Sequence, residues 1–277
     1  MLKNISVIAV VYNEGHRIET FLKSFSWSDD VIVVDKSSTD NTREIALKYT
    51  ENVILVPYSD TGDEIKYGLA QAKNDWILTV TASDLIHPKL VKKIIKLINT
   101  KDFDFEVISL PFAIYVFGIR NPKRSPWGLV NKEWLIKKEV LSPSKEVHKE
   151  MEHNSKKIFK MGFSETENLY HLTHESMETF LERHTRYTRC EALKYNDEKT
   201  AFRSSLKELL RSVYEVFIKK RSFLLGWDGL ALGLAYISYF IFKYLFIWEK
   251  FRGKGSTEYS KIKQDIIKLW EDESKIK

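Results

Sequence analysis

Four short apolar runs recur through the first eighty residues, and a segment with helical spacing follows each of them. The first run, Ile5–Val11, is rich in β-branched residues and is typical of a strand covered on both faces. The other runs span residues 31–34, 53–56 and 76–80, and the helical segments span residues 18–25, 43–49, 65–72 and 88–99. Strands that alternate with helices through short connections predict right-handed β-α-β units. We therefore expect a Rossmann-like α/β fold, with a mostly parallel sheet and helices on both faces.

Beyond residue 105 the alternation becomes irregular. Residues 106–114 predict one more strand, residues 118–156 are rich in Trp, Pro and charge, and helical spacing dominates from Ser176 onwards. Neither an internal repeat nor a low-complexity linker divides the sequence. We therefore expect a sheet domain over residues 1–165 and a helical extension over residues 166–277 that packs on it.

The helical extension contains an apolar, aromatic segment at about residues 217–252. Within it, residues 229–242 carry no charge, a stretch shorter than the roughly 20 residues of a membrane-spanning helix. Basic residues, among them Lys219, Lys220 and Lys250, flank this stretch. The pattern favours a helix in the plane of an anionic membrane surface, with a buried core helix and a true span as alternatives.

The first apolar run is too short for a signal peptide and is followed at once by polar residues. We therefore expect a cytoplasmic protein that is peripherally associated with the inner face of the cell membrane. The sequence leaves open whether the chain forms a homo-oligomer.

The formal net charge of +6 suits anionic partners such as nucleotide phosphates and acidic lipid headgroups. Nucleic-acid binding would rest on charge alone, because no helix-turn-helix, zinc-finger or RNA-recognition signature occurs, and we expect no nucleic-acid partner. Arg183, Arg186 and Arg189 recur at every third position of a predicted helix. They indicate either a solvated face or a contact with lipid headgroups or a phosphorylated acceptor.

The remaining cysteine and histidine signals are weak. Cys190 is the sole cysteine, which excludes an internal disulfide and fits a reducing compartment. His171 and His174 have the spacing of a zinc-binding pair, but no second pair with a suitable interval accompanies them.

Polar residues follow three of the predicted strands at the point where each strand ends. They are Tyr12, Asn13 and Glu14 after the first strand, Asp35 and Ser37 at the second, and Ser83, Asp84 and His87 after the fourth. Because ligands of parallel sheets collect at the carboxyl ends of the strands, these side chains predict a ligand crevice. Its carboxylates can accept hydrogen bonds from a ribose or a base, or hold a divalent cation that bridges phosphates. Helix capping is the alternative role for Thr39 and Asp40.

The stretch VIAVVYNEGHRIETFLKS, followed by DDVIVVDKSSTDNTREIA, resembles the opening of family-2 glycosyltransferases, especially the branch of lipopolysaccharide-core glucosyltransferases. The similarity continues through GDEIKYGLAQAKNDWILTVTASD, VHKEM and LYHLTHESMETFLERHTRYTRCEALKY to the tail GWDGLALGLAYISYFIFKYLFIWEK. The resemblance implies a GT-A fold and a transferase that moves a sugar, a hexose, from a nucleotide-diphosphate sugar with inversion at the anomeric carbon. The implied acceptor is a lipid-linked or lipopolysaccharide-type cell-surface glycan.

The resemblance also implies roles for individual residues. Asp35 would contact uracil or ribose, which favours a UDP-sugar, and the donor would also lie beside Val11, Tyr12, Asn13, Glu14, Ser37, Lys66, Ser83 and Asp84. A carboxylate near VHKEM would take the proton of the acceptor hydroxyl, because an alcohol is a weak nucleophile. Glu150 is the first candidate for this base, Glu146 is the second, and His148 lies between them.

Two departures from the family pattern affect the residues that would bind the diphosphate of the donor. Thr81 and Ser83 occupy the places of the usual Asp-x-Asp motif, so that Asp84, helped by His87, would be left to hold a Mg²⁺ or Mn²⁺ ion. An arginine that the family places in the preceding helix is replaced by Ile65. The alternative is direct neutralisation of the phosphates by one or more of Lys66, Arg120, Lys123 and Arg124. The departures also leave a second hypothesis, a catalytically degenerate GT-A-like binding module on the membrane surface.

Overall fold

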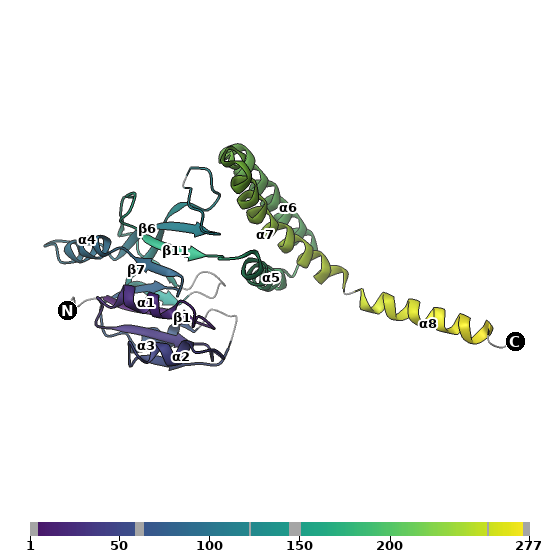
Figure 1. Ribbon diagram of the computed structural model, residues 1–277, viewed down its shortest axis with the longest axis horizontal. Helices are drawn as coiled ribbons and strands as arrows, with labels where there is room; N and C mark the ends of the chain where they lie inside the picture. Colours follow the sequence, from purple (N-terminus) through teal and green to yellow (C-terminus); the bar gives the residue numbers. More distant parts are fainter. Residues whose placement is uncertain (1–4, 59–63, 122, 144–150, 254, 274–277) are drawn as a thin grey trace.

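The computed structural model describes residues 5–58, 64–121, 123–143, 151–253 and 255–273 of the chain. Figure 1 shows an α/β body, a group of helices on one side of it, and a last helix that extends away from the rest. The expected alternation is confirmed. In chain order the first half contains β1 (Ile5–Val11), α1 (Ile18–Phe25), β2 (Val31–Asp35), α2 (Thr42–Ala46), β3 (Val53–Leu55), α3 (Ile65–Gln71), β4 (Trp76–Val80), β5 (Asp84–Ile86) and α4 (Pro88–Ile98).

The first four strands form a parallel sheet in the order β3-β2-β1-β4. Because side chains alternate along a strand, Val7 and Ala9 of β1 pack on the face that α1 covers, whereas Ile8 packs with Ile65 of α3 on the opposite face. The expectation of helices on both faces is therefore confirmed. Since the strands are parallel, their carboxyl ends meet at one edge, and this edge positions the site.

Antiparallel pairing extends this sheet. β7 (Leu129–Lys137) pairs with β4 and with β6 (Val107–Val116), which confirms the strand expected near residues 106–114. β11 (Leu169–Thr173) lies between β6 and β5, while β10 (Ile158–Lys160) pairs with another part of β6. A short turn, η1 (Lys138–Val140), leads into a separate ribbon of β8 (Leu141–Pro143) and β9 (Met151–His153).

The expected domain boundary at residue 165 does not coincide with the end of the sheet. β11 lies beyond it and is still hydrogen-bonded to both β5 and β6. Its five residues include one histidine, His171, and lack the apolar run of a buried strand, so their pairing is not visible in the sequence. The helical extension starts at Met177.

The helical extension contains α5 (Met177–Leu193), α6 (Glu198–Tyr214), η2 (Glu215–Lys219), η3 (Ser222–Leu225), α7 (Gly226–Arg252) and α8 (Ser256–Glu273). α5 and α6 both pack against α7. The extension also contacts the sheet domain, as expected: Arg183 of α5 forms an ion pair with Glu14, and the ring of Tyr236 on α7 lies 5.3 Å from that of Trp127.

The helix that contains the apolar segment is longer than the uncharged stretch at residues 229–242. Residues Ser222–Arg252 form one helical stretch that is long and apolar enough to cross a membrane by length and composition. Lys243, which interrupts the uncharged stretch, is buried against α5 and α6, where its ammonium lies 3.0 Å from Glu191 and 2.8 Å from Glu208. Its charge is thus neutralised within the helical extension.

Candidate active site

A cavity of about 880 Å³ lies between the carboxyl ends of the parallel strands and the helices α5 and α7. The sheet side contributes the predicted residues Val11, Tyr12, Asn13, Glu14 and Ser83, and the helices contribute a second wall. That wall includes Thr179, Arg183, His184, Arg186, Tyr187, Cys190, Tyr236, Tyr239 and Phe240, and His174 adjoins it from the loop before α5. The cavity lies at the position where the sequence predicts a ligand crevice.

The loops after β1 and β2 are joined by side-chain hydrogen bonds. The backbone N–H of Asn13 donates to Ser38 Oγ at 2.9 Å, and Asn13 Oδ1 accepts from the backbone N–H of Thr39 at 2.8 Å. Asn13 and Ser37 adopt positive φ angles of 54° and 56°. A positive φ is uncommon outside glycine and recurs at ligand sites, where the surrounding structure must hold it. These bonds fix the rim of the cavity before a ligand arrives.

Asp35 is completely buried at the end of β2. Its Oδ1 accepts a hydrogen bond from the backbone N–H of Ser38 at 2.9 Å, whereas Oδ2 has no partner within the described part of the chain. Lys36, which follows Asp35 in the chain, and Val11, which pairs with Asp35 across the sheet, both line the cavity. Glu64, which precedes α3 and lines the cavity, likewise has a buried oxygen without a described partner. Buried polar atoms are nearly always hydrogen-bonded, so these oxygens indicate acceptors for a ligand.

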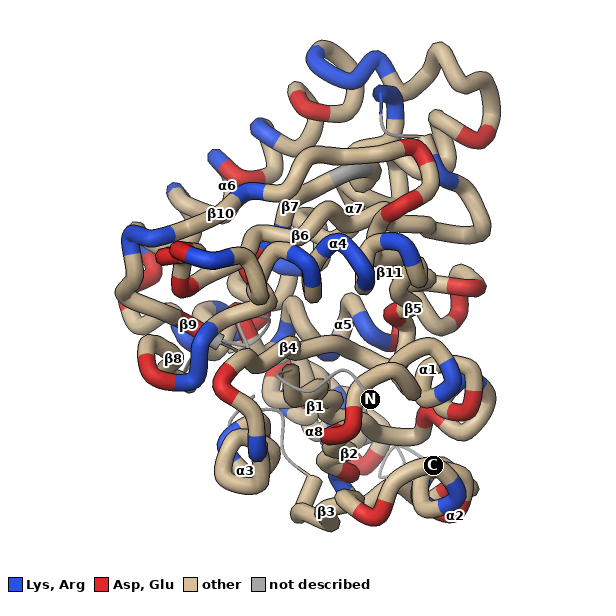
Figure 2. The backbone as a smooth tube through the Cα atoms, turned by 90° about the vertical axis from the view of Figure 1, so that its left-hand side faces the viewer, with Lys and Arg blue, Asp and Glu red and all other residues tan. Residues whose placement is uncertain are grey.

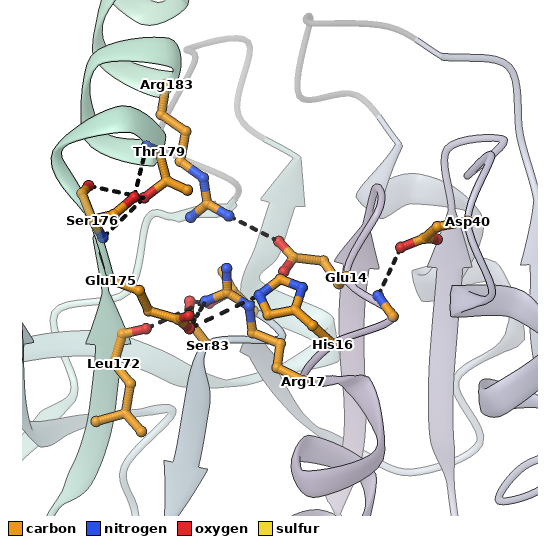
Figure 3. A network of polar contacts seen from close by, with 12 residues as sticks. Glu14, His16, Arg17, Asp40, Ser83, Leu172, Glu175, Ser176, Thr179 and Arg183 are labelled. Carbon is orange, nitrogen blue, oxygen red and sulfur yellow. Dashed lines mark hydrogen bonds and ion pairs between the residues drawn. The ribbon is translucent and has the colours of Figure 1, made fainter.

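Glu14 lies between two arginines from distant parts of the chain (Figure 3). Its Oε2 is 2.6 Å from Arg17 Nε, and its Oε1 is 3.4 Å from Arg183 Nη2. Arg17 also donates to the carbonyl oxygen of Leu172 at 3.3 Å. This contact joins the first helix of the sheet domain to the end of β11.

Asp84 is completely buried and its carboxylate is occupied by protein groups. Oδ2 accepts from the backbone N–H and the hydroxyl of Thr81 at 2.7 and 3.0 Å, and Oδ1 is 2.7 Å from His171 Nδ1. His87 caps α4 by accepting a hydrogen bond from the backbone N–H of Lys89 at 3.1 Å. Within the described ranges, no group of three or more His, Cys, Asp or Glu side chains could hold a metal ion. Asp84 and His87, the predicted metal ligands, thus both have protein partners in the described structure.

The basic residues predicted for the phosphates do not line the cavity. Lys66 is exposed, with its ammonium 5.3 Å from the ring centroid of Tyr67. Arg120 donates to the carbonyl oxygen of Glu165, and Arg124 to that of Lys220. Lys123 is exposed. The cations that do line the cavity are Arg17, Lys36, Lys132, Arg183 and Arg186.

The regular spacing of the arginines in α5 is the sequence pattern that indicates some of these cavity-lining cations. Arg183 and Arg186 reach the cavity, whereas Arg189 is exposed and its guanidinium lies 5.1 Å from the ring centroid of Phe246. One side of the predicted basic stripe therefore faces the site. The candidate bases Glu146, His148 and Glu150 lie outside the described residues.

Two histidines on the helical wall are packed among aromatic rings. The ring of His184 lies 4.7 Å from that of His174 and 5.0 Å from that of Tyr239. Burial, together with the charges of His184 and Arg183, lowers the pKa of His174 to about 3. His174 is therefore neutral at physiological pH and adds no positive charge to the cavity.

Residues 6–166, more than half of the chain, match the family model described as glycosyl transferase family 2. The chain belongs to this family. The resemblance in the first strands is confirmed, and the chain is a glycosyltransferase with a GT-A α/β fold. Membership of the family supports a nucleotide-sugar donor.

Similar proteins carry related names. The glycosyltransferase RP128 of Rickettsia prowazekii is 24% identical over 242 residues, 82% of this chain and 81% of that protein. The O-antigen chain rhamnosyltransferase WbaN of Salmonella anatum is 29% identical over 110 residues, 36% of this chain and 35% of that protein. Several other relatives, like WbaN, are matched over about a third of their length.

Among solved structures, the chain is similar to glucosyl-3-phosphoglycerate synthase of Mycobacterium tuberculosis in complex with Mg²⁺ and UDP. The identity is 23%, the match covers 40% of this chain and 43% of that one, and the TM-score is 0.34.

Proposed function

We propose that this glycosyltransferase moves a hexose from a UDP-sugar, with inversion, to a lipid-linked or lipopolysaccharide-type cell-surface glycan. The buried Oδ2 of Asp35, beside the cavity and without a partner among the described residues, carries the proposal. A buried carboxylate oxygen needs a donor, and the hydroxyls of a ribose or the N–H of a base can supply one. The name of WbaN, an O-antigen chain rhamnosyltransferase, supports an acceptor of the cell-surface class.

In the proposed reaction the acceptor oxygen attacks the anomeric carbon while the bond from that carbon to the donor phosphate breaks. The electron pair of the broken bond stays on the nucleoside diphosphate, and a base takes the proton of the acceptor hydroxyl. Glu150, with Glu146 next, remains the proposed base.

Calorimetric titration with UDP-glucose, GDP-mannose and dTDP-rhamnose tests the proposed donor. We expect UDP-glucose to bind with a Kd of roughly micromolar to millimolar and to be hydrolysed slowly without acceptor, because water can replace the missing nucleophile. If none of the three binds, the transferase proposal is wrong. Binding with neither hydrolysis nor transfer to an envelope lipid extract would favour the degenerate binding module, which the replaced Asp-x-Asp motif also suggests.

We further propose that the protein binds an anionic membrane surface through an apolar ridge formed by exposed residues of α6, η2, η3 and α7. The ridge comprises Leu206, Leu210, Ile218, Leu224 and Trp227, of which Trp227 is 86% exposed. Lys219, Lys220 and Arg221 interrupt it with positive charge. Acidic residues accompany the basic ones along α6, whose charged positions are visible in Figure 2. Apolar side chains that alternate with basic ones suit the boundary between acyl chains and acidic headgroups.

Co-sedimentation with vesicles of phosphatidylcholine and phosphatidylglycerol tests the ridge. We expect the double variant Leu224→Ser/Trp227→Ala to lose most of its binding, because two large apolar groups no longer enter the acyl region. Leu193→Ser, a similarly exposed leucine on α5, is the control and should bind like the unaltered protein. Equal binding by all three proteins would contradict the proposal.

A further inference from the structure

A divalent cation does not fit the described residues at the end of β4. Mg²⁺ and Mn²⁺ require several oxygen ligands, normally including carboxylates. Here the cavity is lined by the hydroxyls of Thr81 and Ser83 and by the ring of His171, whereas Asp84 does not line it and its two oxygens contact Thr81 and His171. The described residues bring together no group of three or more His, Cys, Asp or Glu side chains that could hold the ion. The positive charge that a leaving diphosphate needs must therefore come from another part of the cavity.

The two arginines that contact Glu14 can supply this positive charge. Arg17 and Arg183 bring two guanidinium groups to one carboxylate, and their side chains are 14% and 26% exposed. Glu175 also lies 3.8 Å from Arg17, but at 61% exposure this pair is weakened by solvent. Lys36 and Arg186 line the same cavity and add two further cations. The walls around Glu14 therefore hold more cationic groups than buried carboxylates.

The two arginines come from the two sides of the cavity. Arg17 lies at the start of α1 and is held by the Leu172 carbonyl, and Arg183 projects from α5 toward the loop after β1 (Figure 3). A guanidinium remains charged in proteins, and its planar fork matches two phosphate oxygens. Glu14 thus orients two groups suited to bind a phosphate that enters between β1 and α5.

We propose that Arg17 and Arg183 neutralise the donor diphosphate in place of a divalent cation, so that donor binding is independent of metal. The proposal rests on the proposed function, since it concerns the donor of that reaction. When the bond between sugar and phosphate breaks, the diphosphate keeps the electron pair and gains one negative charge. The two guanidinium groups stabilise this charge without losing a proton.

Calorimetry of the full chain with UDP, GDP and dTDP, each in EDTA and in Mn²⁺, tests the metal independence. We expect one diphosphate to bind with the same Kd, within about twofold, in both buffers. Binding that requires Mn²⁺ would overturn this inference and leave the proposed function standing. Absence of binding in both buffers would overturn the proposed function itself, so the two failures are distinct.

Arg183→Gln tests the arginines in EDTA. We expect the Kd for the diphosphate to rise about tenfold or more, because a charge-assisted contact is lost, whereas the Kd for the matching nucleoside stays unchanged. Arg183→Lys keeps the charge but not the planar fork, so its Kd for the diphosphate should lie between those of the unaltered protein and Arg183→Gln. Arg189→Gln removes an exposed arginine from the same helix and should bind normally. An unchanged diphosphate Kd in Arg183→Gln, or an equal loss for the nucleoside, would overturn the role of Arg183.

Discussion

Asp35→Asn is expected to weaken nucleotide binding about 100-fold, as measured by calorimetric titration with the diphosphate that binds the unaltered protein. The buried Oδ2 of Asp35 has no partner in the described residues, so its negative charge is available to a ligand donor. The asparagine amide would present either its neutral oxygen, a weaker acceptor than a carboxylate, or its NH2 group, a donor that would face the donor of the ligand. Most of the charge-assisted hydrogen bond is thereby lost.

The fold should tolerate this change. An asparagine can still accept the hydrogen bond from the Ser38 backbone through its own oxygen, so the stability of Asp35→Asn should stay close to that of the unaltered protein. Asp29→Asn, which alters an exposed aspartate two residues before β2, is the matched control and should bind normally. Full-strength nucleotide binding by Asp35→Asn would refute the donor site proposed at the end of β2.

Lys243→Ala is expected to lower the free energy of unfolding by about 3 kcal/mol, as measured by urea denaturation at neutral pH. Burial alone would lower the pKa of Lys243, but its hydrogen bonds to Glu208 and Glu191 outweigh burial and raise that pKa above its ordinary value. The ammonium is therefore charged at neutral pH. Removing it leaves two carboxylates close together between α5, α6 and α7 with no cation between them.

Two further variants separate this charge effect from the loss of packing. Lys219→Ala breaks an exposed pair with Glu215 and should cost no more than about 1 kcal/mol. The triple variant Lys243→Met/Glu191→Gln/Glu208→Gln removes all three charges and should recover most of the stability. If the triple variant is as unstable as Lys243→Ala, packing rather than charge explains the loss.

The sequence by itself determined the order of the first strands and helices and the place of the cavity. Apolar runs and helical spacing are local patterns, and each follows from which faces of an element are buried. Because parallel strands end at one edge, the positions of Asn13 and Glu14 after an apolar run were enough to place them in one crevice, and Asp35 lies next to it as the strand partner of Val11. Family membership confirmed the fold that these patterns indicate.

The tertiary structure alone decided which charged groups share the cavity. Glu14 and Arg183 are 169 residues apart in sequence, and no local pattern encodes their 3.4 Å contact. Asp84 has the residue type of a metal ligand, and only the pairing of β11 with β5 reveals that His171 Nδ1 lies 2.7 Å from its carboxylate. Spacing along a chain fixes the face on which a side chain lies. Its partners depend on how distant elements pack, and here that packing, rather than any motif, assembled the arginines around Glu14.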